Sequence, residues 1–356
     1  MAELNSGVGV HTIAEILSEP ATWSACLQRV EPTELQCLDQ TLPRGMEWVF
    51  IGCGSSFYLA QSAAASWSLL TGEKARAIPA SEIMFFPQTF PVPCQPVLIS
   101  RSGNTSEVVK AAEYLERRLK IRTLTITCGT NTALQKVSSH SIRLPDADEK
   151  STVMTRSFTS MLLVLQSLAA VRRNQRDFLN GARKLSEQVA VRLNEIHATV
   201  KSLVHGNTFA DYVFLGQGPF FGIAQESMLK VKEMSCSYAQ SFHTLEFRHG
   251  PKAIVSPETL ITFILSDSGF AAEVAVLEEI KQLGGKTFAI TNTANATVRH
   301  SSDFLVELSL EVPETARAAA SVIPGQLLGF YTGLKKGLNP DEPRNLSRVV
   351  MLESSK

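Results

Sequence analysis

The feature that most constrains the fold of this 356-residue chain is an internal repeat. Four short segments recur in the same order, each displaced by 163 to 166 residues. The pairs are Trp48–Gly54 with Tyr212–Gly218, Val97–Gly103 with Phe263–Gly269, Leu124–Thr127 with Phe288–Thr291, and Ser138–His140 with Ser301–Asp303. Ordered matches at a nearly constant offset indicate that one domain occurs twice.

Each copy alternates short apolar runs with longer segments of helical periodicity. Runs such as Trp48–Ile51, Pro96–Ile99 and Thr123–Thr127 are typical of strands buried on both faces of a parallel sheet. Ser106–Leu119 and Ala271–Leu283 have the length and spacing of helices between them. The pattern predicts two tandem three-layer α/β/α domains, flavodoxin-like or Rossmann-like, with parallel sheets.

The copies and their flanking segments suggest three parts. Residues 1–190 comprise an N-terminal helical segment and the first domain, and residues 191–340 comprise a linker helix and the second domain. A helical pattern over Leu185–Val200 joins the two copies. Residues 341–356 form a C-terminal tail outside the second sheet.

Composition excludes several classes of protein. Lysine plus arginine and aspartate plus glutamate number 34 each, so no long-range field favours nucleic acid or an anionic membrane. Six scattered cysteines and seven histidines show no metal-binding spacing. The start, MAELNSGVGV, lacks the basic and apolar regions of a signal peptide. We expect a reduced, cytoplasmic protein without metal or cofactor.

Small hydroxyl side chains follow two strands of the first copy. Gly52–Ser56 and Ser100–Ser106 lie where strands end and helices begin, at the edge where open parallel sheets bind ligands. Backbone amides and nearby side chains there would surround one phosphate. The side chains are those of Ser56, Ser100, Arg101, Ser102 and Thr105. The alternative is that these residues only form turns and helix caps.

The second copy serves as an internal control for the phosphate prediction. Asp267 replaces Arg101, and Phe270–Ala272 replaces Asn104–Ser106. An acidic loop with few hydroxyls repels phosphate, so the phosphate-binding prediction applies to the first copy alone. A dinucleotide site is disfavoured because Phe57 stands where the third glycine of a GxGxxG motif belongs.

Acid–base candidates lie in the second copy. Lys230 and Glu233 share one helix face, whereas Lys232 points elsewhere. By spacing alone an exposed salt bridge is the favoured interpretation, because Lys–Glu pairs at this spacing are common. His249 precedes Gly250 and Pro251, which break regular structure, so it is expected on a loop, where a lone histidine is usually solvated.

Taken together, these motifs resemble those of the double sugar-isomerase (SIS) domain family. This family includes the isomerase half of glutamine–fructose-6-phosphate aminotransferase and stand-alone amino-sugar-phosphate deaminases and isomerases. The similarity runs from about residue 12 to residue 353. Its motifs are Glu15–Pro20, Gly52–Ser56, Ala80–Glu82, Ile99–Thr105, Thr155–Thr159, Leu229–Glu233, Arg248–Pro251 and Asp341–Leu346.

The resemblance implies a role for each matching residue. Glu233 moves a proton between C1 and C2, Lys230 assists at the sugar hydroxyls, and His249 opens the ring from the neighbouring subunit of a homodimer. Arg348 in the tail is a fourth catalytic candidate, and the tail closes over the site. The sugar itself would contact Cys53, Gly54, Ser55, Thr152, Met154 and Ser347. These groups suit an enediol or enolamine mechanism that needs no cofactor.

Three departures from the family pattern leave the substrate open. Arg101 stands where the synthase usually has glutamine, Met154 replaces a small hydroxyl residue, and Arg348 replaces lysine. We also expect no glutaminase domain. The leading hypothesis is interconversion of an amino-sugar 6-phosphate, such as glucosamine 6-phosphate, and a ketose 6-phosphate, such as fructose 6-phosphate. The alternatives are a deglycase of amino-acid-linked sugar phosphates and a non-catalytic phosphosugar sensor.

Overall fold

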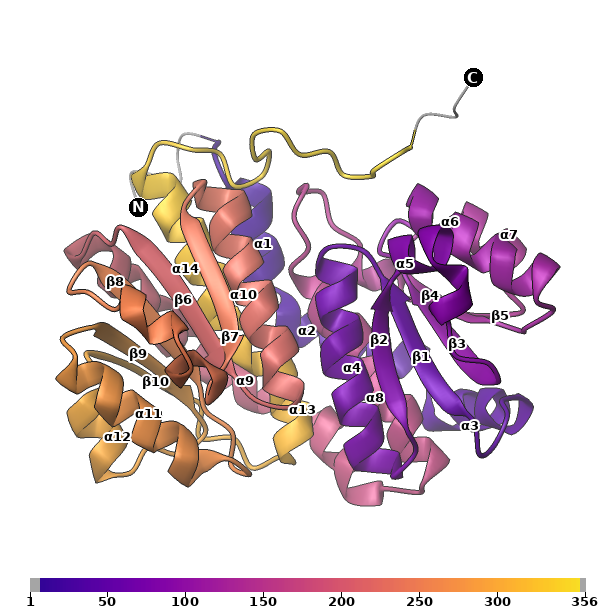
Figure 1. Ribbon diagram of the computed structural model, residues 1–356, viewed down its shortest axis with the longest axis horizontal. Coiled ribbons are helices and arrows are strands. Elements are labelled where there is room, and N and C mark those ends of the chain that lie inside the picture. The colour runs from indigo at the N-terminus through magenta and orange to yellow at the C-terminus, as the bar shows by residue number, and fades with distance from the viewer. Residues whose placement is uncertain (1–6, 353–356) are drawn as a thin grey trace.

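The computed structural model describes residues 7–352. Residues 1–6 and 353–356 lie outside the described residues. The first of these segments belongs to the start of the chain that was considered as a signal peptide, and the second is the end of the predicted tail. Two α/β domains lie side by side, the first mainly in purple and the second in colours from rose through orange to yellow (Figure 1).

Each domain contains a five-stranded sheet in which all neighbouring strands are parallel. The first sheet has the order β2-β1-β3-β4-β5, and the second, read from its β7 edge, has the matching order β7-β6-β8-β9-β10. This order is that of flavodoxin-like folds. The strands are β1 Glu47–Gly52, β2 Ala75–Pro79, β3 Cys94–Ile99, β4 Leu124–Thr127, β5 His140–Arg143, β6 Asp211–Gly216, β7 Tyr238–His243, β8 Thr259–Ile264, β9 Lys286–Thr291 and β10 Phe304–Glu307. The predicted fold class is confirmed.

Helices flank both sheets. The first domain uses α4 Ser55–Thr71, α5 Ala80–Phe85, α6 Ser106–Glu113, α7 Ala133–Val137 and α8 Arg156–Arg172, after α1 Val10–Leu17, α2 Glu19–Arg29 and α3 Pro32–Thr41. The second uses α10 Pro219–Ser235, α11 Phe270–Gln282, α12 Ala296–Ser301, α13 Glu314–Ser321 and α14 Ile323–Lys335. Short turns are η2 Pro87–Thr89, η3 Tyr114–Arg118, η4 Pro145–Ala147, η5 Glu246–Arg248 and η6 Pro251–Ile254. Within residues 7–352, no helix has the length and apolarity needed to cross a bilayer.

The predicted helices and linker differ from the observed ones at their ends. The helix predicted over Ser106–Leu119 is α6 followed by the π-helical turn η3. The linker is α9 Arg176–Gly206, which contains the predicted boundary between residues 190 and 191. Its buried apolar residues continue on both sides of that boundary, so a single helix packs along both domains.

The turns after β1 and β6 show how closely the duplicated backbones agree. Gly54 has φ 55° and ψ −129°, and Gly218 has φ 53° and ψ −127°. Residues other than glycine rarely adopt this backbone conformation. The two glycines therefore aim α4 and α10 away from their strands in the same way.

The domains meet through α4 and α10, which face each other at the centre of the molecule (Figure 1). A Cβ on Gly222 of α10 would lie 2.5 Å from the carbonyl oxygen of Tyr58 on α4. Glycine at this point lets the two helices approach closely. The amino-terminal half of α10 thereby lies against the helix that begins at the first predicted phosphate loop.

Candidate active site

Two loops of the first domain start at the carboxyl ends of β1 and β3, which are neighbours in the sheet. Ser55 and Ser56 form the buried first turn of α4. After β3, the hydroxyl of Ser100 accepts a hydrogen bond from the Gly103 amide at 3.0 Å and lies 3.2 Å from the Thr105 hydroxyl. The loop folds back on itself and ends at the N-terminus of α6, where an anion is favoured.

Ser102 and Thr105 lie on this loop with partly exposed side chains. The Ser102 hydroxyl accepts a 3.2 Å hydrogen bond from the Asn104 amide. The predicted phosphate residues Ser56, Ser100, Ser102 and Thr105 therefore all occur at one edge of the first sheet. Their contact with phosphate stays a prediction.

Arg101 has a different environment from the one predicted. Its buried guanidinium lies 3.1 Å from the buried carboxylate of Glu149. It also donates to the carbonyl oxygens of Val153 at 3.0 Å, Thr152 at 2.9 Å and Arg348 at 3.1 Å. The guanidinium that was expected to bind phosphate is thus already bound by four oxygens of the protein. The arginine joins the loop to the segment before α8 and to the tail, which is a positioning role.

Lys230 lies at the centre of a buried charged cluster on α10. Its side chain is fully buried, with the Nζ atom 2.5 Å from Glu233 and 3.1 Å from Glu226. The same nitrogen donates to the Ser55 hydroxyl of the first domain at 3.2 Å. The alternative of an exposed salt bridge is wrong for this pair, because the cation lies inside the domain interface. Lys232 is exposed on the opposite side, as its spacing predicts.

Burial and charge act in opposite directions within this cluster. Burial lowers the pKa of Lys230, but the carboxylates of Glu226 and Glu233 raise it, and the net shift is upward. Burial raises the pKa of Glu226 to about 7, while the Lys230 charge opposes that shift. The ammonium is therefore held in its charged form, and a carboxyl group beside it titrates close to neutrality.

Glu226 is a residue that the sequence reasoning missed. It is four residues before Lys230, a spacing that puts both on one helix face. That spacing was available from the sequence, but the complete burial of Glu226 was not. Burial of this side chain depends on α4 and α14, which pack against α10.

Glu233 combines contact with the cation and access to solvent. Its side chain is 18% exposed, compared with 0% for Glu226. Glu233 is thus fixed by the Lys230 ammonium and is also open to solvent. A carboxylate in this position can transfer a proton to a bound molecule. Glu226 has no such access.

His249 occupies an exposed turn between η5 and η6, as predicted from the following glycine and proline. The turn follows the edge strand β7 of the second sheet. Donation of His249 across a dimer interface stays a prediction.

Three further predicted residues lie in or contact the loops after β1 and β3. Met154 is buried, and its sulfur lies 3.8 Å from the Ser56 hydroxyl. Thr152 uses its carbonyl oxygen to accept from Arg101 and its amide to reach the tail at Asp341. Burial raises the pKa of Cys53 to about 12, which keeps the thiol neutral and unreactive.

The C-terminal tail crosses from the second domain to the first (Figure 1). Asp341 accepts two 2.7 Å hydrogen bonds from Thr12 on α1. Farther along, the carbonyl of Val350 accepts from the Ser106 amide at the start of α6. Tail residues thus lie beside the loop that is predicted to bind phosphate.

The two tail residues with predicted roles are both exposed. Ser347 donates to the Val349 carbonyl, and Arg348 forms a 2.7 Å ion pair with Asp148. Asp148 belongs to the first domain, so Arg348 ties the tail to that domain through its guanidinium as well as through its carbonyl oxygen. A catalytic role for Arg348 stays a prediction.

The fold and the α10 cluster define a class: a duplicated flavodoxin-like protein in which the start of α4 contacts a buried acid–base cluster of the second domain. Residues 47–171 and 211–332 each match the SIS domain. The chain belongs to the SIS domain family.

Solved structures with the same fold include that of glucosamine-6-phosphate deaminase from Thermotoga maritima. It is 28% identical, aligns over 96% of this chain and 99% of its own, and has a TM-score of 0.79. Tagatose-6-phosphate ketose/aldose isomerase from Escherichia coli, at 22% identity, aligns over 97% of this chain and 96% of its own with a TM-score of 0.83. At that identity the second structure shows the fold alone.

A longer relative is glutamine–fructose-6-phosphate aminotransferase from Pyrobaculum aerophilum. It is 26% identical over 96% of this chain. The alignment covers 57% of the aminotransferase, so the chain spans little more than half the length of this relative.

Proposed function

We propose that the chain is an amino-sugar-phosphate isomerase or deaminase. The reaction we infer converts glucosamine 6-phosphate and water into fructose 6-phosphate and ammonia. The observation that carries the proposal is the buried Lys230 between Glu226 and Glu233, in contact with Ser55 of the other domain. A phosphosugar sensor needs a binding loop but has no use for a buried acid–base cluster beside it.

The chemistry requires a proton to move between adjacent carbons. After ring opening, Glu233 removes the proton from C2 of the aldose, which gives an enolamine. Protonation at C1 by the same carboxyl group gives a ketimine, and water hydrolyses the ketimine to the ketose and ammonia. Lys230 stabilises the negative charge that develops on the sugar oxygen, and Glu226 keeps Lys230 charged and in place.

The remaining groups bind the substrate. Ser56, Ser100, Ser102 and Thr105 would receive the phosphate with the N-terminus of α6. Arg101 would hold the loop in shape through Glu149. His249 of a second subunit would open the ring, and the tail would close over the bound sugar beside Ser106. The relative from Thermotoga maritima, named as a glucosamine-6-phosphate deaminase, supports this choice of substrate.

The test is a substrate panel assayed for three products. Pure protein is incubated with glucosamine 6-phosphate, galactosamine 6-phosphate and an amino-acid conjugate of fructose 6-phosphate, and ammonia, ketose and amino acid are measured. We expect ammonia and ketose in equal amounts. Glu233→Gln should lower kcat about 10²- to 10⁴-fold, the usual contribution of general acid–base catalysis. Lys232→Met on the same helix is the matched control and should keep its activity.

Other outcomes contradict the proposal in distinguishable ways. Release of an amino acid from the conjugate, without ammonia from either amino sugar, would make the chain a deglycase. Tight binding of all three compounds without turnover would make it a sensor. Full activity of the Glu233→Gln variant would remove this carboxylate from the reaction.

A further inference from the structure

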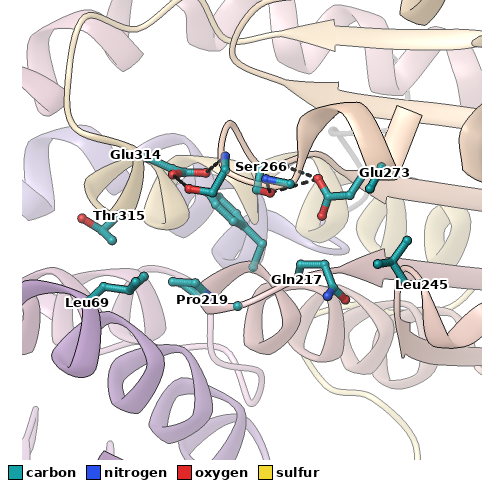
Figure 2. A pocket seen from close by; sticks show the side chains of 13 residues that line it. Leu69, Gln217, Pro219, Leu245, Ser266, Glu273, Glu314 and Thr315 are labelled. Carbon is teal, nitrogen blue, oxygen red and sulfur yellow. Dashed lines mark hydrogen bonds between the residues drawn. The ribbon is translucent and has the colours of Figure 1, made fainter. Parts of the chain in front are cut away.

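The second domain contains a pocket of about 300 Å³ at the carboxyl ends of β6 and β8 (Figure 2). This volume is at the lower end of the range for small-molecule sites. Gly218 and Pro219 from the β6 turn and Ser268 from the β8 loop line it, together with Leu69 from α4 of the first domain. The pocket thus lies between the domains, as the candidate active site does.

The repeat relates this pocket to the active site. Gly218 is 164 residues after Gly54, and Ser268 is 166 residues after Ser102. Helices α4 and α10 begin at equivalent positions, so Leu69 corresponds to Glu233. The pocket is therefore the duplicate of the active site, with a leucine in place of the catalytic carboxylate.

Its loop cannot receive an anion, because a carboxylate of the protein already fills it. Oε1 of Glu314 accepts from the amides of Asp267 at 2.6 Å and Ser268 at 3.1 Å. Oε2 of Glu314 accepts from the Ser268 hydroxyl at 2.6 Å. Glu314, at the start of α13, takes the position that a phosphate would need, and it makes this side of the pocket negative.

A second carboxyl group faces the pocket from α11. Glu273 is fully buried and uses Oε2 to accept from the Ser266 amide at 2.7 Å and hydroxyl at 3.0 Å. Its other oxygen, Oε1, is buried and has no hydrogen-bond partner among the described residues. Figure 2 shows this oxygen turned away from Ser266. A buried carboxyl oxygen beside a pocket is a hydrogen-bond acceptor for a ligand.

The rest of the lining completes an amphipathic site. Gln217 has a buried side-chain oxygen that likewise lacks a partner within residues 7–352. Leu69, Pro219, Leu245 and Ala272 form apolar walls. A ligand that matches these features carries a hydrogen-bond-donating positive group at one end and a compact hydrocarbon body at the other.

We propose that this pocket is a second ligand site, which binds a small organic cation: a primary ammonium on a compact apolar body. The ammonium donates to the free oxygen of Glu273 and to the Gln217 carbonyl, and the body packs against Leu69, Pro219 and Leu245. The site is separate from the proposed catalytic reaction and does not depend on it.

The electrostatics of Glu273 agree with this ligand class. Burial raises the pKa of Glu273 to about 7, the hydrogen bonds from Ser266 lower it, and the nearby Glu314 charge raises it. No cation among the described residues forms a salt bridge with Glu273. A bound ammonium supplies the missing positive charge. An alkylammonium is fully charged at pH 8, where Glu273 is mostly ionised.

The test is calorimetric titration of the full chain at pH 8 with three probes of one shape. Cyclohexylammonium carries the positive charge, cyclohexanol is neutral, and cyclohexanecarboxylate is negative. We expect cyclohexylammonium to bind at least tenfold more tightly than either of the other two, as one charge-assisted hydrogen bond provides.

Three variants locate the binding. Glu273→Gln keeps the shape and removes the charge, and it should weaken cyclohexylammonium binding roughly tenfold or more. Ala272→Phe places a bulky ring at the exposed mouth of the pocket and should abolish binding, whereas Ala271→Phe, equally exposed but outside the lining, should not. Glu233→Gln reports the active site and should leave the affinity unchanged.

Several results would overturn the proposal. These are the absence of cyclohexylammonium binding, equal binding of the neutral probe, and unchanged binding by the Glu273→Gln or the Ala272→Phe variant. Loss of binding in Glu233→Gln alone would assign the ammonium to the active site. Circular dichroism of each variant confirms that it is folded before titration.

Discussion

The two copies of the domain share a backbone and differ in a small number of side chains. Strand order and the glycine turns after β1 and β6 agree closely. Yet the charged residues of α10 have uncharged counterparts on α4: Glu226, Lys230 and Glu233 correspond to Ser62, Ser66 and Leu69. Buried strands and glycine turns preserve the fold, so the residues at the domain interface were free to diverge.

The β3 and β8 loops show the same divergence with reversed charges. In the first domain the loop supplies Arg101, which binds Glu149 from outside the loop. In the second the loop supplies Asp267, which binds Arg317 from α13. Each loop forms an ion pair through its own side chain, but in the second loop two amides and the Ser268 hydroxyl are also occupied by Glu314.

The largest expected effect separates α10 from an ordinary surface helix. Lys230→Met leaves Glu226 and Glu233 without their cation, and we expect the free energy of unfolding to fall by about 3–5 kcal/mol. Lys232→Met, on the exposed side, should change it by less than about 0.5 kcal/mol. Urea denaturation of both variants measures the difference. Equal stabilities would mean that the buried cluster contributes no more than a surface charge.

The loop ion pairs give the next comparison. Arg101→Met strands the buried carboxylate of Glu149 and should lower the free energy of unfolding by about 3 kcal/mol. Asp267→Asn affects a pair whose acidic member is 55% exposed, and about 1 kcal/mol or less is expected. Thermal or chemical denaturation checks the order. A larger loss for Asp267→Asn would show that the second loop depends more on its ion pair.

The pH dependence of stability tests Glu273. Its folded pKa of about 7 lies above the ordinary 4.5, so the folded state holds the proton over a range where the unfolded state has released it. This contribution is present below about pH 4.5 and is lost as pH rises through 7. Glu273→Gln should therefore reduce the decline in stability between pH 5 and 8 by about 1–3 kcal/mol. Glu278→Gln, at an exposed position on the same helix, should leave this decline unchanged. If stability fell equally with pH in the unchanged protein and in both variants, Glu273 would be solvated and not buried.

The smallest effect concerns the equivalent serines of the two loops. Ser102→Ala should weaken the binding of fructose 6-phosphate about tenfold, because one hydrogen bond to an anion is lost, and should leave fructose binding nearly unchanged. Ser268→Ala should alter neither, since that hydroxyl serves Glu314. Titration calorimetry gives both affinities. Equal weakening of phosphorylated and free sugar would remove phosphate from the role of this loop.

Local pattern predicted much of the site. Burial of the strands, the shared face of Lys230 and Glu233 and the turn at His249 all follow from spacing and from glycine and proline. The contact of the Arg101 side chain with Glu149 does not follow from local pattern, because the two residues are 48 positions apart. The sequence also did not predict that Glu314 would bind the second loop, because Glu314 lies 46 and 47 residues beyond the amides that it accepts from.

The amino-acid order alone determined that the chain is a duplicated parallel α/β protein, since apolar runs and glycines act within a few residues of themselves. Tertiary structure decided which side chains of one copy meet the loops of the other. Lys230 contacts Ser55 across 175 residues because α10 packs on α4 through Gly222. That helix packing buries the charges, and burial distinguishes this lysine and its carboxylates from a common surface pair.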